Sequence, residues 1–493
     1  MILKQVLAGI ALQNDVAPEL RSKDVTGLAY DSRKVAPGYL FFAFPGAKVN
    51  GQAFAEAAIA NGAIAVLSEL PAPANFQHPW IQVEHGRRAL SLAAGNFFDH
   101  IDRRLCITGI TGTNGKTTTS YVIDSILREA GLTTAIIGTI EYRLAGKPRK
   151  AVNTTPESVD LFDIFTELER LGGTHVTMEA SSHALALGRI YGIQFHTAVF
   201  SNLTRDHLDF HGTMENYFAA KHLLFTDENG AAAPRFAVIN HDDAHGRAIK
   251  TASQTEVFWY GLEDGATVRA RKISSSFEGL HFDIEHGGFS YPVESPLVGQ
   301  INVYNILAAW CTGLSYGIAH EVIARGIAAL HAVPGRFERV QEGQPFLVVV
   351  DYAHTDDALR NTIAVARGLT KGRIITLFGC GGDRDRTKRP LMGMAAAENS
   401  DFVVLTSDNP RSEDPLAIMN DAMVGIRRFD TPYIAEPDRE KAITQAIDQA
   451  RPGDIVLIAG KGHETYQILG PKTIDFDDRE VARRVLRSLG YGK

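Results

Sequence analysis

The chain has 493 residues, which is more than one ordinary hydrophobic core contains and predicts about three domains. Hydrophobic residues make up 45% of the chain and charged residues 22%, so a disordered or fibrous protein is excluded. The formal net charge of -7 argues against a general nucleic-acid-binding surface.

The cysteines and the N-terminus indicate the compartment. Cys106, Cys311 and Cys380 are far apart and have no C-x-x-C spacing, so we expect neither a disulfide framework nor a zinc cluster. The N-terminal apolar stretch is short, ends at Gln13 and Asn14, and precedes no small-residue cleavage site. We therefore expect a cytoplasmic protein without membrane insertion.

The first two thirds of the chain predict two α/β domains. Residues 1–100 mix short apolar runs with Ala-rich amphipathic stretches, which indicates a small α/β domain. An apolar strand at 105–109 then leads into a glycine turn, and residues 117–130 have helical spacing. Apolar strands interleaved with helical segments continue to residue 334, so a mainly parallel sheet is expected in a P-loop ATPase-like central domain over 101–334. These strands are expected at 134–140, 175–178, 197–200 and 236–239.

A second series of strands predicts the third domain, over residues 335–493. The helical pattern stops around residues 332–337, and the strands that follow alternate with helices. This pattern is typical of a doubly wound, Rossmann-like fold. The strands are expected at 346–351, 373–378, 402–406 and 454–459.

The segment Gly-Ile-Thr-Gly-Thr-Asn-Gly-Lys-Thr-Thr at 109–118 lies where a nucleotide loop belongs, after a strand and before a helix. Glycines let backbone N–H groups approach phosphate oxygens, Lys116 can contact the outer phosphates, and Thr117 can bind Mg²⁺. The spacing departs from G-x-x-x-x-G-K-[ST], because residue 110 is Ile and Gly109 stands one position too early. The alternative is a glycine turn with an exposed lysine, which the flanking strand and helix disfavour.

Residues 112–118 closely resemble the nucleotide loop of the Mur ligases, the amino-acid-adding enzymes of peptidoglycan synthesis, and of the related folylpolyglutamate synthases. The N-terminal Asp31-Ser32-Arg33 resembles the UDP-sugar-binding segment of the diaminopimelate-adding (MurE) type. Asp356 departs from the pattern, since these enzymes commonly have proline there. Further blocks match the family in order at 178–185, 202–212, 302–305, 335–338 and 351–354.

The resemblance implies an ATP-dependent ligase that adds meso-diaminopimelate to UDP-MurNAc-L-Ala-D-Glu through an acyl phosphate, acts as a monomer and uses two Mg²⁺ ions. Three alternatives stay open: an L-lysine-adding ligase of the same type, a folylpolyglutamate synthase, and a nucleotide-dependent binding module that does not ligate. The Asp31-Ser32-Arg33 segment is not expected in a folylpolyglutamate synthase.

The metal ligands are expected to be Thr117, Glu179, His207 and Lys221. Without the resemblance, Glu179 would be read as a helix-cap carboxylate and His207 as a loop histidine. Lys221 lies on the apolar face of a helix predicted within 215–225, where the usual expectation is that its amine extends to water. The resemblance implies instead that Lys221 carries a CO₂-derived carbamate, and burial of a lysine favours the neutral amine that captures CO₂.

The Asp-Asn-Pro-Arg segment at 408–411 follows a predicted strand, where open α/β sheets bind ligands. Arg411 can grip a carboxylate, the group that distinguishes diaminopimelate from lysine, although it could instead pair with Glu413 or Asp414. Thr154 and Thr155 precede a helix, which suits either anion binding or helix capping, and Asn302 and Asn305 could simply be linker residues.

The resemblance assigns the following site residues in this sequence. Catalysis is expected to involve Lys116, Lys221 and His207; ATP binding Gly112, Thr113, Asn114, Gly115, Lys116, Thr117, Thr118, Asn302, Asn305, Arg336, Asp351 and His354; muropeptide binding Ser32, Thr154, Thr155, Ser181 and Arg189; and diaminopimelate binding Arg384, Asp408, Asn409, Pro410, Arg411, Gly460 and Glu464.

Overall fold

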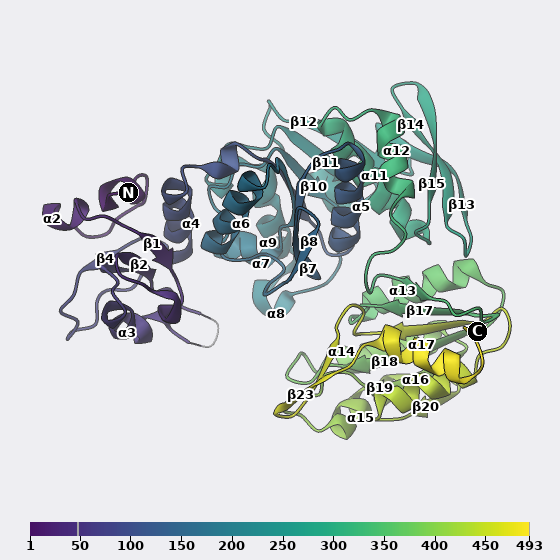
Figure 1. Cartoon of the computed structure of the whole chain (residues 1–493). Coiled ribbons are helices and arrows are strands. Elements are labelled where there is room, and N and C mark those ends of the chain that lie inside the picture. Colours follow the sequence, from purple (N-terminus) through teal and green to yellow (C-terminus); the bar gives the residue numbers. More distant parts are fainter. Residues whose placement is uncertain (47–48, 493) are drawn as a thin grey trace. The chain divides into compact units, whose positions relative to one another are not determined.

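The structure, a computed structural model, describes residues 1–46 and 49–492 (Figure 1). It divides into two compact units. The first comprises Met1–Leu203, Phe210–Tyr260 and Ala308–Ala319, and the second comprises Thr204–Asp209, Gly261–Leu307 and the chain from His320 onward.

The N-terminal part of the first unit is built on a four-stranded parallel sheet. Side chains of successive strand residues point to opposite faces, so Leu40 and Phe42 join one apolar core while Phe41 joins another. The sheet is therefore covered on both faces. Its strands are β1 (Gly27–Ala29), β2 (Tyr39–Phe42), β3 (Ala65–Ser68) and β4 (Trp80–Gln82), and its helices are α1 (Leu3–Val6), α2 (Pro18–Arg21), α3 (Ala55–Ala60) and α4 (Gly86–Phe97).

The larger sheet of the first unit contains the strands β12-β11-β10-β5-β9-β6-β7-β8 in that order. The strands from β12 to β6 are parallel. Those from β11 to β6 are buried on both faces, which explains their continuous apolar sequences, whereas β12 is only partly buried. The strands are β5 (Cys106–Thr111), β6 (Thr134–Ile137), β7 (Glu141–Leu144), β8 (Lys147–Lys150), β9 (His175–Glu179), β10 (Thr197–Phe200), β11 (Phe236–Asn240) and β12 (Glu256–Gly261). The helices are α5 (Lys116–Glu129), α6 (Ser158–Arg170), α7 (Ser182–Leu187), α9 (Met214–His222) and α10 (Ala244–Ala248).

The second unit begins with an antiparallel meander of β13 (Val268–Ser275), β14 (Leu280–His286) and β15 (Phe289–Ser295). Burial alternates along β14, where Leu280, Phe282 and Ile284 are buried. Helix α12 (His320–Ala328) packs against β15, and α11 (Gln300–Ser315) lies between them in the chain.

The C-terminal sheet has the strand order β16-β17-β21-β18-β19-β20, and only the edge strand β16 is antiparallel to its neighbour. Helices α13, α14 and α15 pack on one face and α16 and α17 on the other (Figure 1). This is a doubly wound arrangement. The strands are β16 (Glu338–Val340), β17 (Leu347–Asp351), β18 (Ile374–Cys380), β19 (Phe402–Ser407), β20 (Tyr433–Ala435) and β21 (Ile455–Ala459). The helices are α13 (Asp356–Leu369), α14 (Lys388–Asn399), α15 (Pro415–Ile426), α16 (Arg439–Asp448) and α17 (Asp478–Ser488), and a hairpin of β22 (Tyr466–Leu469) and β23 (Lys472–Asp475) follows β21.

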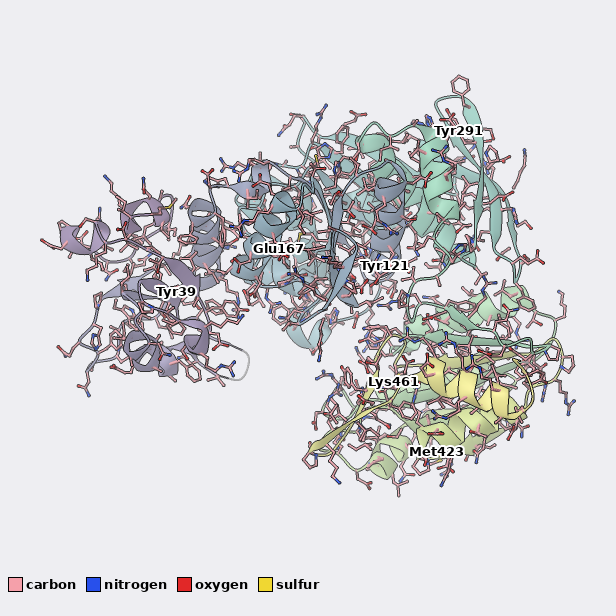
Figure 2. The ribbon with its side chains drawn as sticks, viewed as in Figure 1. Tyr39, Tyr121, Glu167, Tyr291, Met423 and Lys461 are labelled. Carbon is pink, nitrogen blue, oxygen red and sulfur yellow. The ribbon has the colours of Figure 1, made fainter. Side chains whose placement is uncertain are left out.

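The α/β fold class with parallel sheets is confirmed, and the side chains that fill both units are drawn in Figure 2. The meander β13–β15 and the hairpins β7–β8 and β22–β23 were not predicted from the sequence. The boundaries near residues 100 and 334 stay predictions. In the part of the chain that the structure describes, no helix is long and apolar enough to cross a membrane.

Candidate active site

The predicted nucleotide loop turns sharply between β5 and α5. Gly112 has a φ of 144°, and a Cβ there would lie 2.0 Å from Ser201 Oγ, so only glycine fits. Gly115 has a φ of 89° and directly precedes α5. Lys116 Nζ donates to the carbonyl oxygens of Gly112 at 3.0 Å and Thr113 at 2.9 Å. The lysine thus folds back over its own loop.

A second loop, after β10, supports the nucleotide loop. The backbone N–H groups of Thr113 and Asn114 donate to the carbonyl and side-chain oxygens of Asn202 at 2.8 and 2.9 Å. Ser201 Oγ donates to the Asn114 carbonyl at 2.6 Å. Neither Ser201 nor Asn202 was predicted from the sequence to have a role. Their position beside the nucleotide loop could have been predicted, because both residues follow β10, a parallel neighbour of β5, and Phe200 pairs with Thr111 at the carboxyl ends of these strands.

Glu179 connects the nucleotide loop with the neighbouring strand ends. Its side chain is 1% exposed at the end of β9. It accepts hydrogen bonds from Thr117 Oγ1 at 2.9 Å, from the Thr139 backbone N–H at 2.9 Å and from Thr139 Oγ1 at 3.0 Å. The cap of α7 is Ser181, so Glu179 is not a helix cap. A carboxylate and two hydroxyls therefore form a set of hard oxygen donors beside the nucleotide loop.

Lys221 is 1% exposed on α9. Its Nζ donates to the Gly112 carbonyl oxygen at 2.7 Å and lies 4.4 Å from the centre of the Tyr217 ring. The amine therefore does not extend to water. Lys116 and Lys221 both contact the Gly112 carbonyl, so two of the predicted catalytic side chains meet at one point of the loop.

His207 belongs to the second unit, whereas Thr117, Glu179 and Lys221 belong to the first. It has a φ of 53°, and its Nε2 lies 3.4 Å from Asp206 Oδ2. Over residues 1–46 and 49–492, no group of three or more His, Cys, Asp or Glu side chains could hold a metal ion. The predicted ligand set contains only two residues of these types.

The predicted muropeptide residues Thr154, Thr155, Ser181 and Arg189 adjoin Glu179. Thr155 Oγ1 donates to the Glu179 carbonyl at 2.7 Å and to Ser181 Oγ at 3.1 Å. Arg189 Nη1 donates to the Thr155 carbonyl at 3.1 Å, and Thr154 Oγ1 lies 3.1 Å from the Thr139 hydroxyl. Neither threonine caps α6, whose N-cap is residue 157.

A buried carboxylate holds two arginines beside this group. Glu157 is 6% exposed, and its Oε1 accepts from Arg87 Nε at 3.1 Å and lies 3.0 Å from Arg189 Nε. The Arg87 guanidinium lies 4.2 Å from the centre of the Phe44 ring. Of this cluster only Arg189 was predicted from the sequence, because Arg87 lies about 100 residues away and no spacing rule joins it to the others.

Ser32 is buried at the start of a short 3₁₀ turn that follows β1. Its carbonyl accepts from Asn61 Nδ2 at 2.9 Å. Asp31 caps the turn by accepting from the Arg33 backbone N–H, and the Arg33 side chain pairs with Asp31 at 2.7 Å. The Asp31-Ser32-Arg33 segment is therefore a rigid turn that leaves Arg33 exposed.

The predicted adenine residues lie in the second unit. Asn302 and Asn305 are buried on α11, where Asn305 Nδ2 donates to Asn302 Oδ1 at 2.8 Å, so they are not linker residues. Arg336 stacks on the Tyr352 ring at 4.7 Å. Asn302 and Arg336 both line a cavity of about 170 Å³. The other lining residues are Pro296, Leu297, Val298, His331, Ala332, Phe337, Arg339 and Gln341.

Asp351 ends β17 close to this cavity. It accepts from the Phe337 backbone N–H at 2.7 Å and from the Ala353 N–H at 2.9 Å. Burial raises the pKa of the Asp351 carboxyl, and the Arg336 charge opposes that rise. His354 Nδ1 donates to the Tyr352 carbonyl at 2.9 Å. The unusual Asp356 causes no distortion, since Thr355 caps α13 and Asp356 occupies its first turn.

Asp408 and Asn409 directly follow β19 and are 7% and 3% exposed. Arg411 adopts a φ of 53°, a conformation uncommon for a non-glycine residue. Arg411 Nη1 donates to the Gly382 carbonyl at 2.7 Å. Glu413, one of the two alternative partners expected for Arg411, accepts hydrogen bonds from two other arginines instead. These arginines are Arg386 and Arg389, each at 2.7 Å.

The remaining predicted amino-acid-binding residues lie around this segment. Arg384 is exposed and donates to the Asp383 carbonyl at 3.3 Å. Glu464 Oε2 accepts from Asn409 Nδ2 at 2.8 Å. Gly460 has a φ of 115°, and a Cβ there would lie 2.9 Å from Asp408 Oδ2. The structure therefore brings the 408–411 segment together with Gly460 and Glu464.

Family sequence models match three successive parts of the chain. They describe a "Mur ligase family, catalytic domain" at residues 24–98, a "Mur ligase middle domain" at 110–313 and a "Mur ligase, glutamate ligase domain" at 335–462. A curated protein from Solibacter usitatus (strain Ellin6076), called UDP-N-acetylmuramoyl-L-alanyl-D-glutamate--2,6-diaminopimelate ligase, is 67% identical over 491 residues, which cover 100% of this chain and 99% of that protein. A protein of the same name from Geobacillus thermodenitrificans (strain NG80-2) is 46% identical and covers 94% of this chain and 95% of its own.

Solved structures resemble most or all of the chain. A structure of UDP-N-acetylmuramoyl-L-alanyl-D-glutamate--2,6-diaminopimelate ligase matches with a TM-score of 0.71 at 33% identity. The match covers 100% of this chain and 99% of that chain. A folylpolyglutamate synthase from Mycobacterium tuberculosis, complexed with ADP and AMPPCP, has a TM-score of 0.61 at 17% identity, covering 82% of this chain and 94% of that one. The second likeness shows the fold alone.

Proposed function

The chain belongs to the Mur ligase family, and we propose that it adds meso-diaminopimelate to UDP-MurNAc-L-Ala-D-Glu at the expense of ATP. Forming an amide from a carboxylate and an amine in water is uphill. The reaction therefore proceeds through an acyl phosphate. The D-glutamate carboxylate takes the γ-phosphoryl group of ATP and ADP leaves. The amine of diaminopimelate then attacks the acyl carbon, and phosphate leaves from the tetrahedral intermediate.

The nucleotide loop supplies the charge stabilisation that this transfer needs. Phosphoryl transfer depends on positioning and fixed positive groups more than on a protein nucleophile. Lys116 lies over the loop and Gly112 permits the close turn, which supports assigning the β- and γ-phosphates to residues 112–118. Asn302, Asn305, Arg336, Asp351 and His354 are proposed to bind the rest of ATP, and the cavity lined by Asn302 and Arg336 supports this.

The residues beside the loop fit Mg²⁺. Thr117 Oγ1 and the Glu179 carboxylate are hard oxygen donors 2.9 Å apart, and His207 is proposed as a further ligand. When bound, Mg²⁺ neutralises the charge that builds up on the transferred phosphoryl group. Glu179 also receives two hydrogen bonds from Thr139, which hold its carboxylate in place for a metal.

Lys221 also fits a carbamate, since its buried amine lies against the Gly112 carbonyl. A neutral amine attacks the carbon of CO₂, an N–C bond forms and one proton is released. The resulting anion would supply an oxygen ligand to a second Mg²⁺.

The muropeptide is assigned to Ser32, Thr154, Thr155, Ser181 and Arg189. Four of these residues form one hydrogen-bonded group around the end of β9, which supports their acting together. We further propose that the enzyme is monomeric, since one chain supplies the residues for all three substrates, and cytoplasmic, where ATP and UDP-linked precursors are made. Its three free cysteines suit a reducing compartment.

One observation carries the choice of amino acid: Arg411 is held in a left-handed turn that joins residues 408–411 to Gly460 and Glu464. Diaminopimelate has a distal ammonium and a distal carboxylate, and this group offers Glu464 for the first and Arg411 for the second. Arg384 is assigned to the carboxylate as well. Lysine would leave the half-buried guanidinium without an anion.

Phosphate release from ATP tests the proposal, measured with UDP-MurNAc-L-Ala-D-Glu and either meso-diaminopimelate, L-lysine or L-ornithine. We expect the fastest release with meso-diaminopimelate. Faster release with L-lysine would indicate the lysine-adding type, and activity on folate with glutamate would indicate a folylpolyglutamate synthase. Absence of any amino-acid-dependent release would favour a nucleotide-binding module that does not ligate.

A further inference from the structure

A lysine with no assigned role lies within the second unit beneath the proposed amino-acid-binding loops. Lys461, labelled in Figure 2, is 0% exposed and follows β21 by two positions. Burying an ammonium group is costly unless charges and hydrogen-bond acceptors compensate it. Its surroundings therefore explain why a lysine is tolerated at this place.

Every polar neighbour of the Lys461 ammonium is part of the amino-acid-binding loops or of the hairpin beside them. Nζ donates to Glu464 Oε2 at 3.1 Å and to the Tyr466 carbonyl oxygen at 2.5 Å. It also lies 3.5 Å from Asn409 Oδ1 and 4.0 Å from Asp408 Oδ1. The ammonium thus connects residues that are about 55 positions apart in the chain.

These contacts join two loops that do not come from adjacent strands. Residues 408–411 follow β19 and residues 460–464 follow β21, and β18 lies between those strands in the sheet. The sheet hydrogen bonds therefore do not fix the distance between the loops directly. Lys461 contacts both loops at once.

A second buried cation fixes the strand ends below. Arg439 is 2% exposed and donates to the Ser407 carbonyl at 3.3 Å and the Ala459 carbonyl at 3.1 Å, the last residues of β19 and β21. It forms a bidentate pair with Asp478 at 2.7 Å. Because Arg439 already holds the strands, Lys461 is not needed to close the sheet. Lys461 instead contacts residues that follow the ends of these strands, and Asn409 and Glu464 among them are assigned to substrate binding.

We propose that Lys461 is a positioning residue for the amino-acid substrate, which holds Glu464 and the Asp408–Asn409 pair in one fixed arrangement for diaminopimelate. The inference rests on the proposed function. Two donors, Lys461 Nζ and Asn409 Nδ2, hold the Glu464 carboxylate in one position. The Ile468 N–H in turn donates to Asn409 Oδ1 at 2.9 Å and orients that side chain. Without the ammonium, Glu464 would lose one hydrogen-bond donor, and the two loops would lose the side chain that contacts both of them.

The test compares steady-state kinetics of wild type, Lys461→Met, Lys461→Arg and a matched control, Lys472→Met, which removes an exposed lysine from β23. For Lys461→Met we expect the KM for meso-diaminopimelate to rise roughly tenfold or more, while the KM values for ATP and the muropeptide stay within about twofold. Lys461→Arg should be intermediate, because it keeps a buried cation with altered geometry. Lys472→Met should behave as wild type.

If Lys461 had a purely structural role, Lys461→Met would lower the melting temperature without changing the KM for diaminopimelate more than the other two KM values. A folded Lys461→Met variant with a wild-type KM for diaminopimelate would overturn the proposal. If that variant lacks a cooperative unfolding transition, Lys461→Arg decides: an unchanged KM for diaminopimelate again overturns it. Diaminopimelate-dependent turnover by wild type in the same assay tests the proposed function separately.

A double-mutant cycle with Glu464→Gln tests whether Lys461 acts through Glu464. If it does, Lys461→Met should raise the KM for diaminopimelate by less than about twofold in the Glu464→Gln background, since the group it positions is already altered. Fully multiplicative losses would show that the two residues act independently, and the positioning role would be wrong.

Discussion

The Lys221 ammonium donates a 2.7 Å hydrogen bond to the carbonyl oxygen of Gly112, a residue 109 positions earlier in the chain. Helix α9 is thereby joined to the nucleotide loop at the residue whose φ of 144° only glycine readily adopts. The contact explains how a lysine that is 1% exposed is accommodated, and it gives the amine a fixed position beside the proposed phosphate site.

Lys221→Ala should lose most ligase activity, roughly a hundredfold or more, because the proposed second metal loses its anionic ligand. Added short carboxylates should partly restore turnover by occupying the vacated space. The measurement is phosphate release with and without formate or acetate, with exposed Lys250→Ala as the control. Wild-type turnover in Lys221→Ala, with no response to bicarbonate depletion, would contradict the carbamate.

Glu157→Gln should weaken muropeptide binding. The Glu157 carboxylate orients the Arg87 and Arg189 guanidiniums through contacts of 3.1 and 3.0 Å, and an amide lacks the negative charge that pairs with the two cations. We expect the KM for UDP-MurNAc-L-Ala-D-Glu to rise about tenfold with little change in the KM for ATP.

The matched control for that variant is Glu169→Gln, which alters an exposed carboxylate paired with Arg104. Equal changes in the muropeptide and ATP KM values for Glu157→Gln would point to general destabilisation. An unchanged muropeptide KM would show that the arginine pair does not need the carboxylate.

Continuous apolar runs predicted the parallel strands well, because strands buried on both faces leave a simple pattern. Residues 197–200 were predicted as a strand, and β10 has those bounds. The meander β13–β15 was missed, since its half-buried strands carry charged residues such as Arg269, Arg271 and Asp283 on their exposed faces. Their alternation is weaker evidence than a run of apolar residues.

The resemblance predicts site residues within sequence blocks, but it does not predict the side chains that contact and support them. Glu157, Lys461 and Arg439 act through contacts with residues 20 to 70 positions away, and only the folded chain brings those residues together. The sequence around Lys461 carries no pattern that marks it as buried. Its burial depends on the way β18 separates β19 and β21, which local sequence does not encode.

His175 should make the fold sensitive to acid. It packs edge-on against the buried Tyr316 ring at 4.8 Å, and His196 stacks on the same ring at 4.7 Å. Burial, with a smaller effect of the His196 charge, lowers the pKa of His175 to about 4. The folded state therefore binds fewer protons than the unfolded state, whose histidine has a pKa of about 6.5.

Stability from this histidine should be fully present above pH 6.5 and be lost as the pH falls toward 4. His175→Asn removes the titration, so between pH 7 and 5 the wild type should lose about 1–2 kcal/mol more than the variant, after allowance for partial exposure. Urea unfolding at both pH values measures this, with exposed His281→Asn as the control. Equal losses in wild type and His175→Asn would rule out this source of acid sensitivity.

Arg411 should decide between diaminopimelate and lysine. The guanidinium donates to the Gly382 carbonyl at 2.7 Å, and the backbone of Arg411 joins the hairpin through the Ile468 carbonyl at 3.2 Å and the Gly470 N–H at 2.9 Å. The side chain is therefore presented by a loop of fixed shape. Removing it takes away the group that pairs with the distal carboxylate, which lysine lacks.

Two variants separate the guanidinium from the backbone. Arg411→Ala removes the side chain and places alanine at a φ of 53°, whereas Arg411→Asn introduces a residue that tolerates this conformation. Both should lower kcat/KM for meso-diaminopimelate relative to L-lysine by roughly 30-fold or more, the effect of losing a charged hydrogen-bonded pair. The KM for ATP should stay near the wild-type value. If only Arg411→Ala changed the preference, the loop conformation rather than the guanidinium would be responsible. If Arg411→Asn and Arg411→Ala both kept the wild-type preference, Arg411 would not be the residue that recognises the carboxylate.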